Sequence, residues 1–235
     1  MRRTPEPELM DAPAQASAYA EADFSESNQA FVDQFVALAD GHERRSPAVI
    51  DLGCGPGDIC IRIAQALPDW HIIGLDAGPN MLKLAQAAVD AKQLSHQISL
   101  VHAHLPCTLP EIDSDDQARN SLQATVQAIV SNSLLHHLPD PMSLWTTIAE
   151  QAPAGCLIQV MDLHRPETVD QAQALVKAYA GDAPDVLAND FYNSLLAAYT
   201  ADEVEAQLQD CGLGHLSVNQ TSDRHWQVQG IMTAR

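Results

Sequence analysis

The pattern of apolar and polar residues predicts a chain in which strands and helices alternate. Short apolar runs of strand length are separated by longer stretches in which apolar residues recur at helical spacing. The apolar runs lie near 48–52, 71–75 and 97–102, from residue 126 onward, and near 156–162. The helical stretches lie at 58–67, 79–92 and about 141–151. Alternation of this kind implies a parallel sheet with right-handed crossovers.

The two ends of the chain depart from this alternation. Residues 1–12 predict an irregular tail, and two helical patterns follow it up to about residue 40. Two further helical stretches occupy about 166–199, after the fifth strand. A capping box, Thr200 to Glu203, opens the next helix, and residues 215–232 alternate as an antiparallel hairpin does.

The most informative motif is the segment Asp51-Leu52-Gly53-Cys54-Gly55-Pro56-Gly57-Asp58, which follows the first strand. Glycines at alternate positions let the backbone turn sharply and let a ligand approach the main chain. Asp76 ends the second strand, 19 residues after Gly57, where an acid that binds ribose hydroxyls is expected. The sequence therefore predicts a site for a nucleotide-type cofactor, with the N-cap of the next helix as the alternative role for Asp76.

Asp58 bears on which cofactor is bound. In the dinucleotide fingerprint the third glycine stands at this position and leaves the helix N-terminus open to a pyrophosphate. A carboxylate at this position disfavours binding of a pyrophosphate and is compatible with a cationic ligand. An NAD-dependent Rossmann oxidoreductase therefore fits less well, and it stays open as the alternative.

The glycine turn, Asp76 and the segment Ser131–Pro141, which contains His-His-Leu-Pro-Asp-Pro, occur in this order. In these motifs the chain resembles the class I S-adenosylmethionine-dependent methyltransferases of small molecules, over about residues 48–163. The resemblance implies an α/β, Rossmann-like fold with a seven-stranded, mostly parallel sheet in the order 3-2-1-4-5-7-6 and helices on both faces. It also implies N-terminal helices and a helical cap inserted after strand 5.

The same resemblance suggests a division of the chain. Residues 1–40 are expected to be an N-terminal tail and lid helices, and residues 41–235 the methyltransferase domain, with the cap insertion at about 166–199. The aromatic residues of the cap either line a pocket or form a plain helical core.

The cofactor implied is S-adenosyl-L-methionine, with S-adenosyl-L-homocysteine as the product. Asp76 is expected to bind the ribose, Met81 to border the adenine and Asn132 to serve the amino acid end. Where most members carry an acid for the adenine amino group, this chain has His104, whose neutral ring can accept the same bond but would lose it on protonation. A histidine that only faces solvent is the alternative. The expected cofactor residues are Asp51, Gly53, Cys54, Gly55, Asp76, Ala77, Met81, His104, Leu105, Asn132 and, from the lid, Tyr19.

The reaction implied is methyl transfer to a small-molecule acceptor by in-line displacement, in which positioning supplies much of the rate. A base is useful for some acceptors, and histidine suits that role. His137, His164 and His136, in this order, are the catalytic candidates, because they follow strands at the edge where α/β sheets bind ligands. Alternatively, His136 and His137 only fix the turn, or the chain binds S-adenosylmethionine without catalysis.

Composition narrows the partners. The chain has 235 residues, enough for one substantial core, with 12 basic and 31 acidic side chains and a formal charge of −19. Such a surface disfavours nucleic acid and anionic membranes. No run of the sequence is long and apolar enough to span a bilayer, and the N-terminus lacks the pattern of a signal peptide. A cytoplasmic monomer or homodimer is expected.

Cysteine and histidine content suggest no metal centre. The five cysteines are scattered, form no C-x-x-C pair and are expected to be reduced. A metal site would need His102 and His104 to converge with His136 and His137, and no third partner is predictable from the sequence. The acidic stretch 109–117 lacks calcium-loop spacing and is expected to be a solvated loop.

Overall fold

The computed structural model describes residues 1–6, 11–41, 47–108 and 126–234. The predicted acidic loop 109–117 and residues 7–10 of the predicted tail lie outside the described residues.

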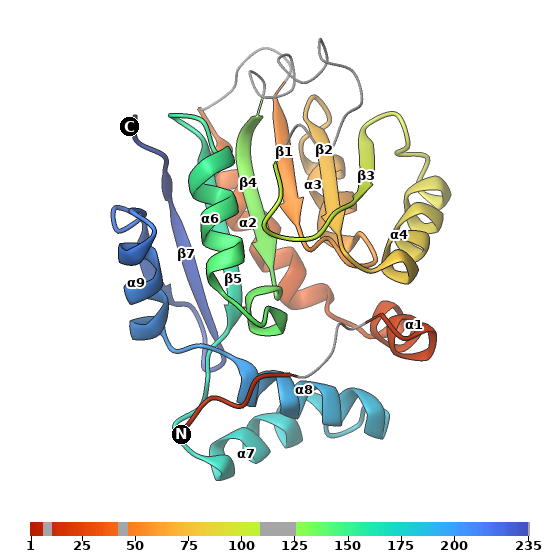
Figure 1. Cartoon of the computed structure of the whole chain (residues 1–235). Coiled ribbons are helices and arrows are strands. Elements are labelled where there is room, and N and C mark those ends of the chain that lie inside the picture. Colours follow the sequence, from red (N-terminus) through yellow and green to blue (C-terminus); the bar gives the residue numbers. More distant parts are fainter. Residues whose placement is uncertain (7–10, 42–46, 109–125, 235) are drawn as a thin grey trace.

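A seven-stranded sheet forms the centre of the molecule, in the order β3-β2-β1-β4-β5-β7-β6 (Figure 1). The strands are β1 (Ala48–Leu52), β2 (His71–Asp76), β3 (Ile98–His102), β4 (Val126–Asn132), β5 (Leu157–Leu163), β6 (Ser217–Gln220) and β7 (His225–Ile231). β7 runs antiparallel to both of its neighbours, and the other pairs of this described sheet are parallel. The predicted strand order and the C-terminal hairpin are confirmed.

The central strands β1, β4 and β5 are buried along nearly their whole length because helices cover both faces of the sheet. Val49, Ile72 and Ala128 point to one cluster of buried residues, whereas their neighbours Ile50 and Ile73 point to the other. Side chains of successive strand residues alternate between faces, so each face receives its own apolar set.

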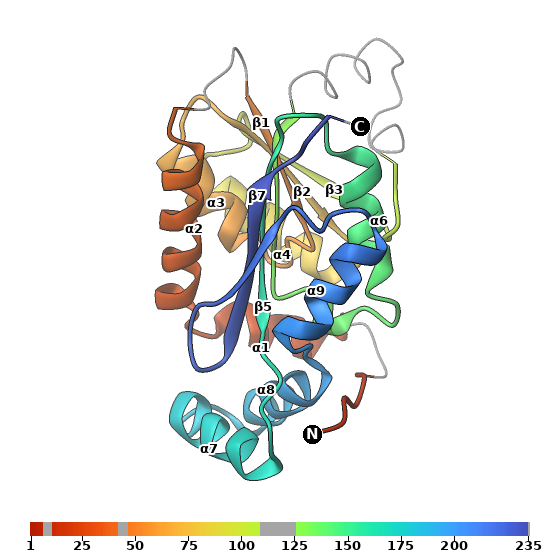
Figure 2. The same cartoon turned by 90° about the vertical axis from the view of Figure 1, so that its left-hand side faces the viewer.

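The helices divide between the two faces, as Figure 2 shows. One face carries α2 (Ser25–Ala39), α3 (Asp58–Ala66) and α4 (Pro79–Ala91), and the other carries α6 (Met142–Gln151) and α9 (Ala201–Asp210). Phe31 and Phe35 of α2 are fully buried, and Gln159 of β5 donates from Nε2 to the Phe31 carbonyl at 2.8 Å. The second N-terminal helix is thus part of the core.

The carboxyl ends of the parallel strands meet at the lower edge of the sheet in Figure 1. Beyond this edge lie α1 (Pro13–Glu21), the short 3-10 helix η2 (Leu135–His137), and the cap helices α7 (Val169–Ala180) and α8 (Asp185–Ala197). The helical insertion after strand 5 is therefore present as expected. Loops and helices at this edge are where open α/β sheets bind ligands.

The first six residues, here called the N-terminal strap (residues 1–6), lie against the cap rather than in solvent (Figure 1). The Thr4 amide donates to the Leu196 carbonyl at 2.9 Å, and Arg3 Nε donates to the Ala197 carbonyl at 2.5 Å. The tail is irregular, as predicted, but its contacts place it beside the carboxyl edge of the sheet.

Within the described part of the chain, no helix combines the length and the apolar character needed to cross a membrane.

Candidate functional site

The glycine turn after β1 has a backbone that other residues would strain. Gly53 has a φ of +75°, and a Cβ added there would lie 2.7 Å from the Leu134 side chain. Gly55 has a φ of +51°, and a Cβ there would meet no atom within 4 Å. Gly53 is thus required by packing, whereas Gly55 exposes its backbone to open space where a ligand can approach.

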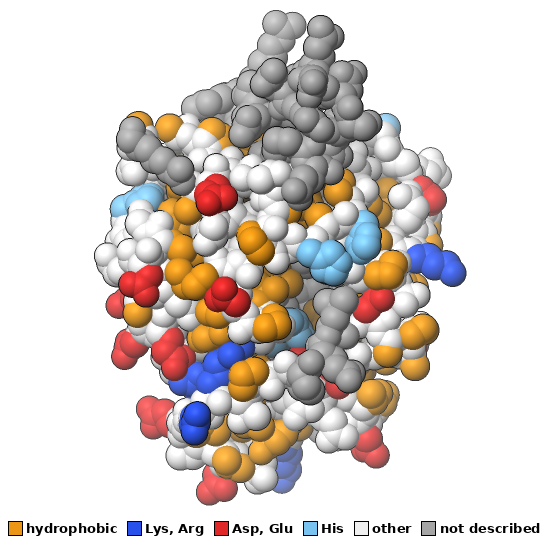
Figure 3. Space-filling model, viewed as in Figure 1, with side chains coloured by type: hydrophobic (Ala, Val, Ile, Leu, Met, Phe, Trp, Pro, Cys, Tyr) orange, Lys and Arg blue, Asp and Glu red, His pale blue; other side chains and the backbone are white. Residues whose placement is uncertain are grey.

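A cavity of about 620 Å³ opens beside this turn, at the carboxyl edge of the sheet. Figure 3 shows a recess near the middle of this face, with histidine side chains in and beside it. All eleven cofactor residues expected from the sequence line the cavity: Asp51, Gly53, Cys54, Gly55, Asp76, Ala77, Met81, His104, Leu105, Asn132 and Tyr19. Segments from across the sequence therefore meet where the family pattern suggests.

Asp76, at the end of β2, ties the turn to the next helix. Its Oδ2 accepts from the Gly55 amide at 2.8 Å and its Oδ1 from the Gly78 amide at 2.7 Å. Burial raises the pKa of Asp76, and these two amides offset only part of that effect. Each oxygen keeps a further lone pair that can accept from a ligand hydroxyl.

The helix-capping role once open to Asp76 is filled by Asp11. Asp11 Oδ1 accepts from the Asn80 amide at 3.0 Å and from the Met81 amide at 3.2 Å, in the first turn of α4. Caps of this kind satisfy amides that have no partner within the helix.

The side of the cavity expected to hold adenine is formed by Ala77, Met81, His104 and Leu105. His102, which precedes this group on β3, contacts the Ala77 carbonyl through Nε2 at 3.0 Å, and its ring lies 5.5 Å from that of His104. His104 lines the cavity and is exposed, so the adenine role and the solvent-facing alternative both stay open.

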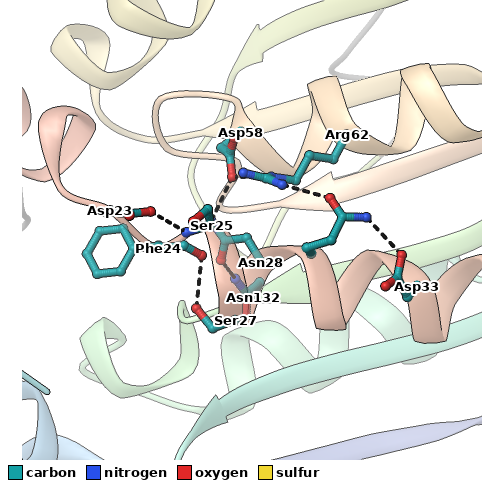
Figure 4. A network of polar contacts seen from close by, with 10 residues as sticks. Asp23, Phe24, Ser25, Ser27, Asn28, Asp33, Asp58, Arg62 and Asn132 are labelled. Carbon is teal, nitrogen blue, oxygen red and sulfur yellow. Dashed lines mark hydrogen bonds and ion pairs between the residues drawn. The ribbon is translucent and has the colours of Figure 1, made fainter.

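The opposite side is closed by a network between α2, α3 and β4 (Figure 4). Asn28 Nδ2 donates to Asp58 Oδ2 at 2.8 Å, and Asn132 Nδ2 donates to Asn28 Oδ1 at 3.1 Å. Asn132 Oδ1 is buried and accepts no hydrogen bond in the described structure. A buried acceptor left in this state costs free energy, so it suits a ligand that brings an N–H donor.

Asp58, the residue in the place of the third dinucleotide glycine, binds two side chains through one of its carboxylate oxygens. Besides the Asn28 amide, its Oδ2 accepts from Arg62 Nε at 2.7 Å, one turn later on α3. The N-terminus of α3 thus already carries a fixed carboxylate and offers no opening for a pyrophosphate.

The lid side of the cavity carries an aromatic pair. The rings of Tyr19 and Phe24 lie 4.8 Å apart, and both residues line the cavity. Burial, together with the carboxylates of Asp162, Asp58 and Asp76, raises the pKa of the Tyr19 hydroxyl to about 12. Tyr19 is therefore a neutral hydrogen-bonding group at physiological pH.

Asp51 supports the turn from below. It is 1% exposed and accepts from Cys60 Sγ at 3.2 Å. Burial raises its pKa to about 7, and the thiol hydrogen bond offsets part of the rise.

Another part of the cavity wall, here called the His137 end, is formed by His137, from η2, and Glu6, from the N-terminal strap. His137 Nδ1 lies 2.7 Å from Glu6 Oε2, and the two side chains are 15% and 12% exposed. The carboxylate is out of line with the ring N–H, so the contact is electrostatic rather than an aligned hydrogen bond. Burial and the charge on His136 lower the pKa of His137, and Glu6 offsets these effects in part.

His136 points away from the cavity and forms a buried ion pair. Its Nδ1 donates to Asp162 Oδ1 at 2.5 Å, and its backbone amide donates to Asp162 Oδ2 at 3.2 Å. Burial alone would lower the pKa of His136, but Asp162 outweighs it, and the pKa is raised. Of the three catalytic candidates, His137 lines the cavity, whereas His136 supports it from behind.

His164 is not among the residues that line the cavity. It follows β5 and forms an isolated bridge with Tyr199, and its backbone amide donates to the Arg224 carbonyl at 2.7 Å. Arg224 also stacks on Tyr179 of the cap, which is 50% exposed. The structure thus places His164 in the packing between β5, β7 and the cap, away from His137.

The cap aromatic residues likewise do not reach this cavity. Phe191 and Tyr192 pack between α7 and α8 around Ala172 and Leu195. Of the two roles left open for these side chains, the helical core accounts for their packing here.

Among the described residues, the group of possible metal ligands that lie close together does not include His102 or His104. It consists of Glu6, His136 and His137, whose ligand atoms lie within 4.8 Å of one another. Arg3 Nη2 donates to the His136 carbonyl at 3.2 Å beside this group. Asp162 pairs with His136, and Glu6 contacts His137.

Sequence reasoning missed three residues of this site. Asp162 had a usable signal, since an acid at the carboxyl end of a buried strand is seldom left unpaired. Asn28 had only its place on a helix near the predicted lid. Glu6 had no signal, because nothing in the sequence shows that an irregular tail returns to a turn about 130 residues later.

Comparison with known proteins agrees with the fold and the cavity. Residues 49–152 match the model of a family described as methyltransferase domain. Trans-aconitate 2-methyltransferase of Methylobacterium radiotolerans is 30% identical over 137 residues, which make up 57% of this chain and 44% of that protein. The matched part spans under half the length of the first curated relatives.

Two solved structures share the fold. A SAM-dependent methyltransferase from Aquifex aeolicus superposes with a TM-score of 0.61 and 13% identity over 94% of this chain and 99% of the other. The plantazolicin methyltransferase BpumL, in complex with SAH, gives a TM-score of 0.63 and 13% identity over 92% of this chain and 90% of the other.

The sheet order and the cavity at its carboxyl edge define a Rossmann-like α/β fold with a cavity in the place where such sheets bind ligands. Within that class, residues 49–152 match the methyltransferase domain model, and the solved neighbours show that the chain has the fold of S-adenosylmethionine-dependent methyltransferases.

Proposed function

We propose that this protein transfers the methyl group of S-adenosylmethionine to a small-molecule acceptor bound at the His137 end of the cavity. The observation that carries the proposal is the single cavity in which the glycine turn, Asp76, Asn132 and His137 meet. The cofactor supplies a methyl group on a sulfonium, which is activated for displacement without help from the protein.

The residues present fit this cofactor. Asn132 Oδ1, buried and without a donor, is suited to the cofactor's ammonium group, and the open backbone at Gly55 gives it room. The Asp76 carboxylate is suited to the two ribose hydroxyls, and Met81 provides an adaptable apolar surface for adenine. Tyr19 and Phe24 close over the same cavity from the lid.

His137 is the residue that we assign to the acceptor's proton. Its lowered pKa keeps the ring neutral near pH 7, so that a ring nitrogen is free to accept a proton. His136, paired with Asp162, holds the turn that carries it. His164 has no part in this proposal, because it lies away from the cavity lining.

The acceptor is a small molecule of unassigned identity in this proposal. Trans-aconitate, which names one relative, belongs in the panel of compounds to be tested, since the match covers only part of each chain. A cytoplasmic location is part of the proposal, because the five scattered cysteines form no C-x-x-C pair in the sequence. A monomer or homodimer without nucleic acid or membrane partners remains the working expectation.

The first test is cofactor selection by isothermal titration calorimetry. S-adenosylmethionine should bind, and reduced nicotinamide cofactor should not, because Asp58 occupies the pyrophosphate position. Asp76→Asn should weaken S-adenosylmethionine binding at least tenfold, about 1.4 kcal/mol. Asp90→Asn, on the exposed end of α4, is the matched control. Preferential binding of the nicotinamide cofactor would restore the oxidoreductase alternative.

The second test is turnover, followed as S-adenosylhomocysteine formed in a pool of metabolites. His137→Gln should lower the rate by about 100-fold, the lower range for acid-base catalysis, while the dissociation constant of S-adenosylmethionine stays the same. Cofactor binding with no turnover in any pool would favour a non-catalytic binding protein.

A further inference from the structure

Glu6 brings an ionised carboxylate into the His137 end of the cavity. Its side chain accepts from Ser194 Oγ of α8 at 2.7 Å and lies 2.7 Å from His137 Nδ1. Burial would raise the pKa of Glu6, but His137 and Ser194 outweigh it and the pKa is lowered. The carboxylate is therefore charged although it is almost enclosed.

The N-terminal strap does not need the Glu6 carboxylate to stay bound to the rest of the protein. Arg3 donates to the Ala197 and His136 carbonyls and stacks on Tyr199 at 4.1 Å, and the Thr4 amide pairs with Leu196. These contacts already attach the strap to the cap and to η2. Burying a carboxylate in addition costs free energy, so its position beside His137 calls for another explanation.

We propose that Glu6 is a positioning residue for His137 and that it selects neutral acceptors with a removable proton, such as alcohols, phenols or acidic carbons. This inference rests on the proposed function and adds the substrate class. The Glu6 charge faces the space where the acceptor binds, so an acceptor carboxylate would meet a like charge in a poorly hydrated site.

The proton balance follows from the contacts. The acceptor's electron pair forms the new bond to the methyl carbon, the carbon–sulfur bond breaks, and its electron pair stays on sulfur. The acceptor's proton moves to a ring nitrogen of His137. Glu6 then lies beside an imidazolium instead of a neutral ring. Because the carboxylate attracts His137 more strongly as positive charge develops on the ring, it stabilises the transition state more than the ground state.

Other charged groups also act on His137. His136 on the same turn opposes its protonation, and Asp162 of β5 favours it. Arg3 of the strap opposes protonation of the neighbouring His136, and Asp76 of β2 is coupled to His137 across the cavity. Glu6 also raises the pKa of His136, so its neutralisation acts on His137 directly and, in the opposite sense, through a weaker charge on His136. The direct contact at 2.7 Å is the nearer of the two effects.

The decisive measurement is a pH titration of isotopically labelled histidine rings by NMR, with His137 assigned by its loss in His137→Gln. Glu6→Gln keeps the shape and the hydrogen-bonding capacity toward Ser194 but removes the charge. The His137 pKa should move downward in this variant, because the carboxylate that stabilises the imidazolium is gone. Glu21→Gln, an exposed acid at the end of α1, is the control and should leave His137 unchanged.

Ser194→Ala separates positioning from anchoring. It removes the hydrogen bond to Glu6 but keeps the charge, so the His137 titration should stay closer to wild type than in Glu6→Gln. An unchanged His137 titration in Glu6→Gln, with the strap still docked, would overturn the positioning role whether or not an acceptor is known.

Acceptor selection is tested with catechol as the phenol and trans-aconitate as the carboxylate, both with saturating S-adenosylmethionine. The wild-type protein should bind catechol more tightly than trans-aconitate. Glu6→Gln should reduce the ratio of the two dissociation constants at least tenfold. Tight binding and methylation of trans-aconitate by wild type would overturn the proposed substrate class and leave methyl transfer itself intact. Failure to bind S-adenosylmethionine would instead refute the proposed function.

Discussion

At the scale of single residues, the His137 end of the cavity depends on how two adjacent histidines differ. His136 is buried against Asp162 and has a raised pKa, whereas His137 faces the cavity with a lowered one. Their ring centroids are 3.9 Å apart, so protonation of both at once is opposed by like charge. The pair therefore keeps one proton on the supporting ring and leaves the cavity ring free.

The buried pair gives a prediction for stability against pH. His136 has a folded pKa above its unfolded value, so its contribution is full below about pH 6.5 and is lost as the pH rises through the raised pKa. Asp162 has a lowered pKa, so its contribution is lost only as the pH falls below about 4. His136→Gln should cost about 3 kcal/mol near pH 5.5 and less at pH 9.

Chemical denaturation across this pH range measures the effect. His215→Gln, at an exposed histidine, is the control and should track wild type at every pH. A destabilisation by His136→Gln that is the same at pH 5.5 and pH 9 would contradict the charged pair.

Residue roles that depend on local spacing could be predicted from the sequence, and those that depend on distant contacts could not. Gly53 and Asp76 are fixed by short-range requirements of turn and strand end, and both line the cavity. His104 lines it too, in the place expected for an adenine partner. Glu6 was missed because its role depends on how the strap packs against the cap, which no local pattern encodes.

At the scale of elements, the two N-terminal helices differ in how firmly they are held. α2 buries Phe31, Val32 and Phe35 against the sheet, whereas α1 buries only Ala16. Tyr19, which lines the cavity, belongs to the weakly held helix. We therefore expect the lid that the sequence suggests to open at α1, with α2 as its fixed support.

Hydrogen exchange should show this difference. Amides of α1 should exchange much faster than those of α2 in the free protein, and saturating S-adenosylmethionine should slow α1 at least about tenfold. Amides of α9, on the other face of the sheet, provide the control and should change little. If α1 exchange is insensitive to the cofactor, α1 is not the lid.

Element positions followed the sequence closely because the periodicity is strong and the turn residues are well placed. The Thr200 to Glu203 capping box was predicted, and both of its hydrogen bonds are present. A second capping box, Thr168 to Gln171, begins α7 and could have been predicted from the same sequence pattern. The docking of α7 and α8 could not be predicted, since apolar spacing alone does not distinguish a pocket wall from a helix core.

At the scale of the whole molecule, the negative charge of the chain extends into its cavity. Among the described residues, the lining includes five carboxyl side chains, Glu6, Asp23, Asp51, Asp58 and Asp76, and two basic ones, Arg62 and Lys92. On the face seen in Figure 3, acidic side chains are likewise spread around the recess. The excess of acid favours a positively charged cofactor over an uncharged one.

The acid lining has a consequence for how the cycle ends. The donor carries a positive sulfonium when it arrives, and it is a neutral thioether once its methyl group has gone. In the proposed reaction, the acidic lining attracts the cationic S-adenosylmethionine but not the neutral thioether of S-adenosylhomocysteine. This difference favours release of the product. Between 50 and 500 mM NaCl, the dissociation constant of S-adenosylmethionine should rise several-fold while that of S-adenosylhomocysteine changes little, as calorimetry can measure. If both dissociation constants depend equally on salt, loss of the sulfonium charge does not control product release, and movement of the lid would be the remaining explanation.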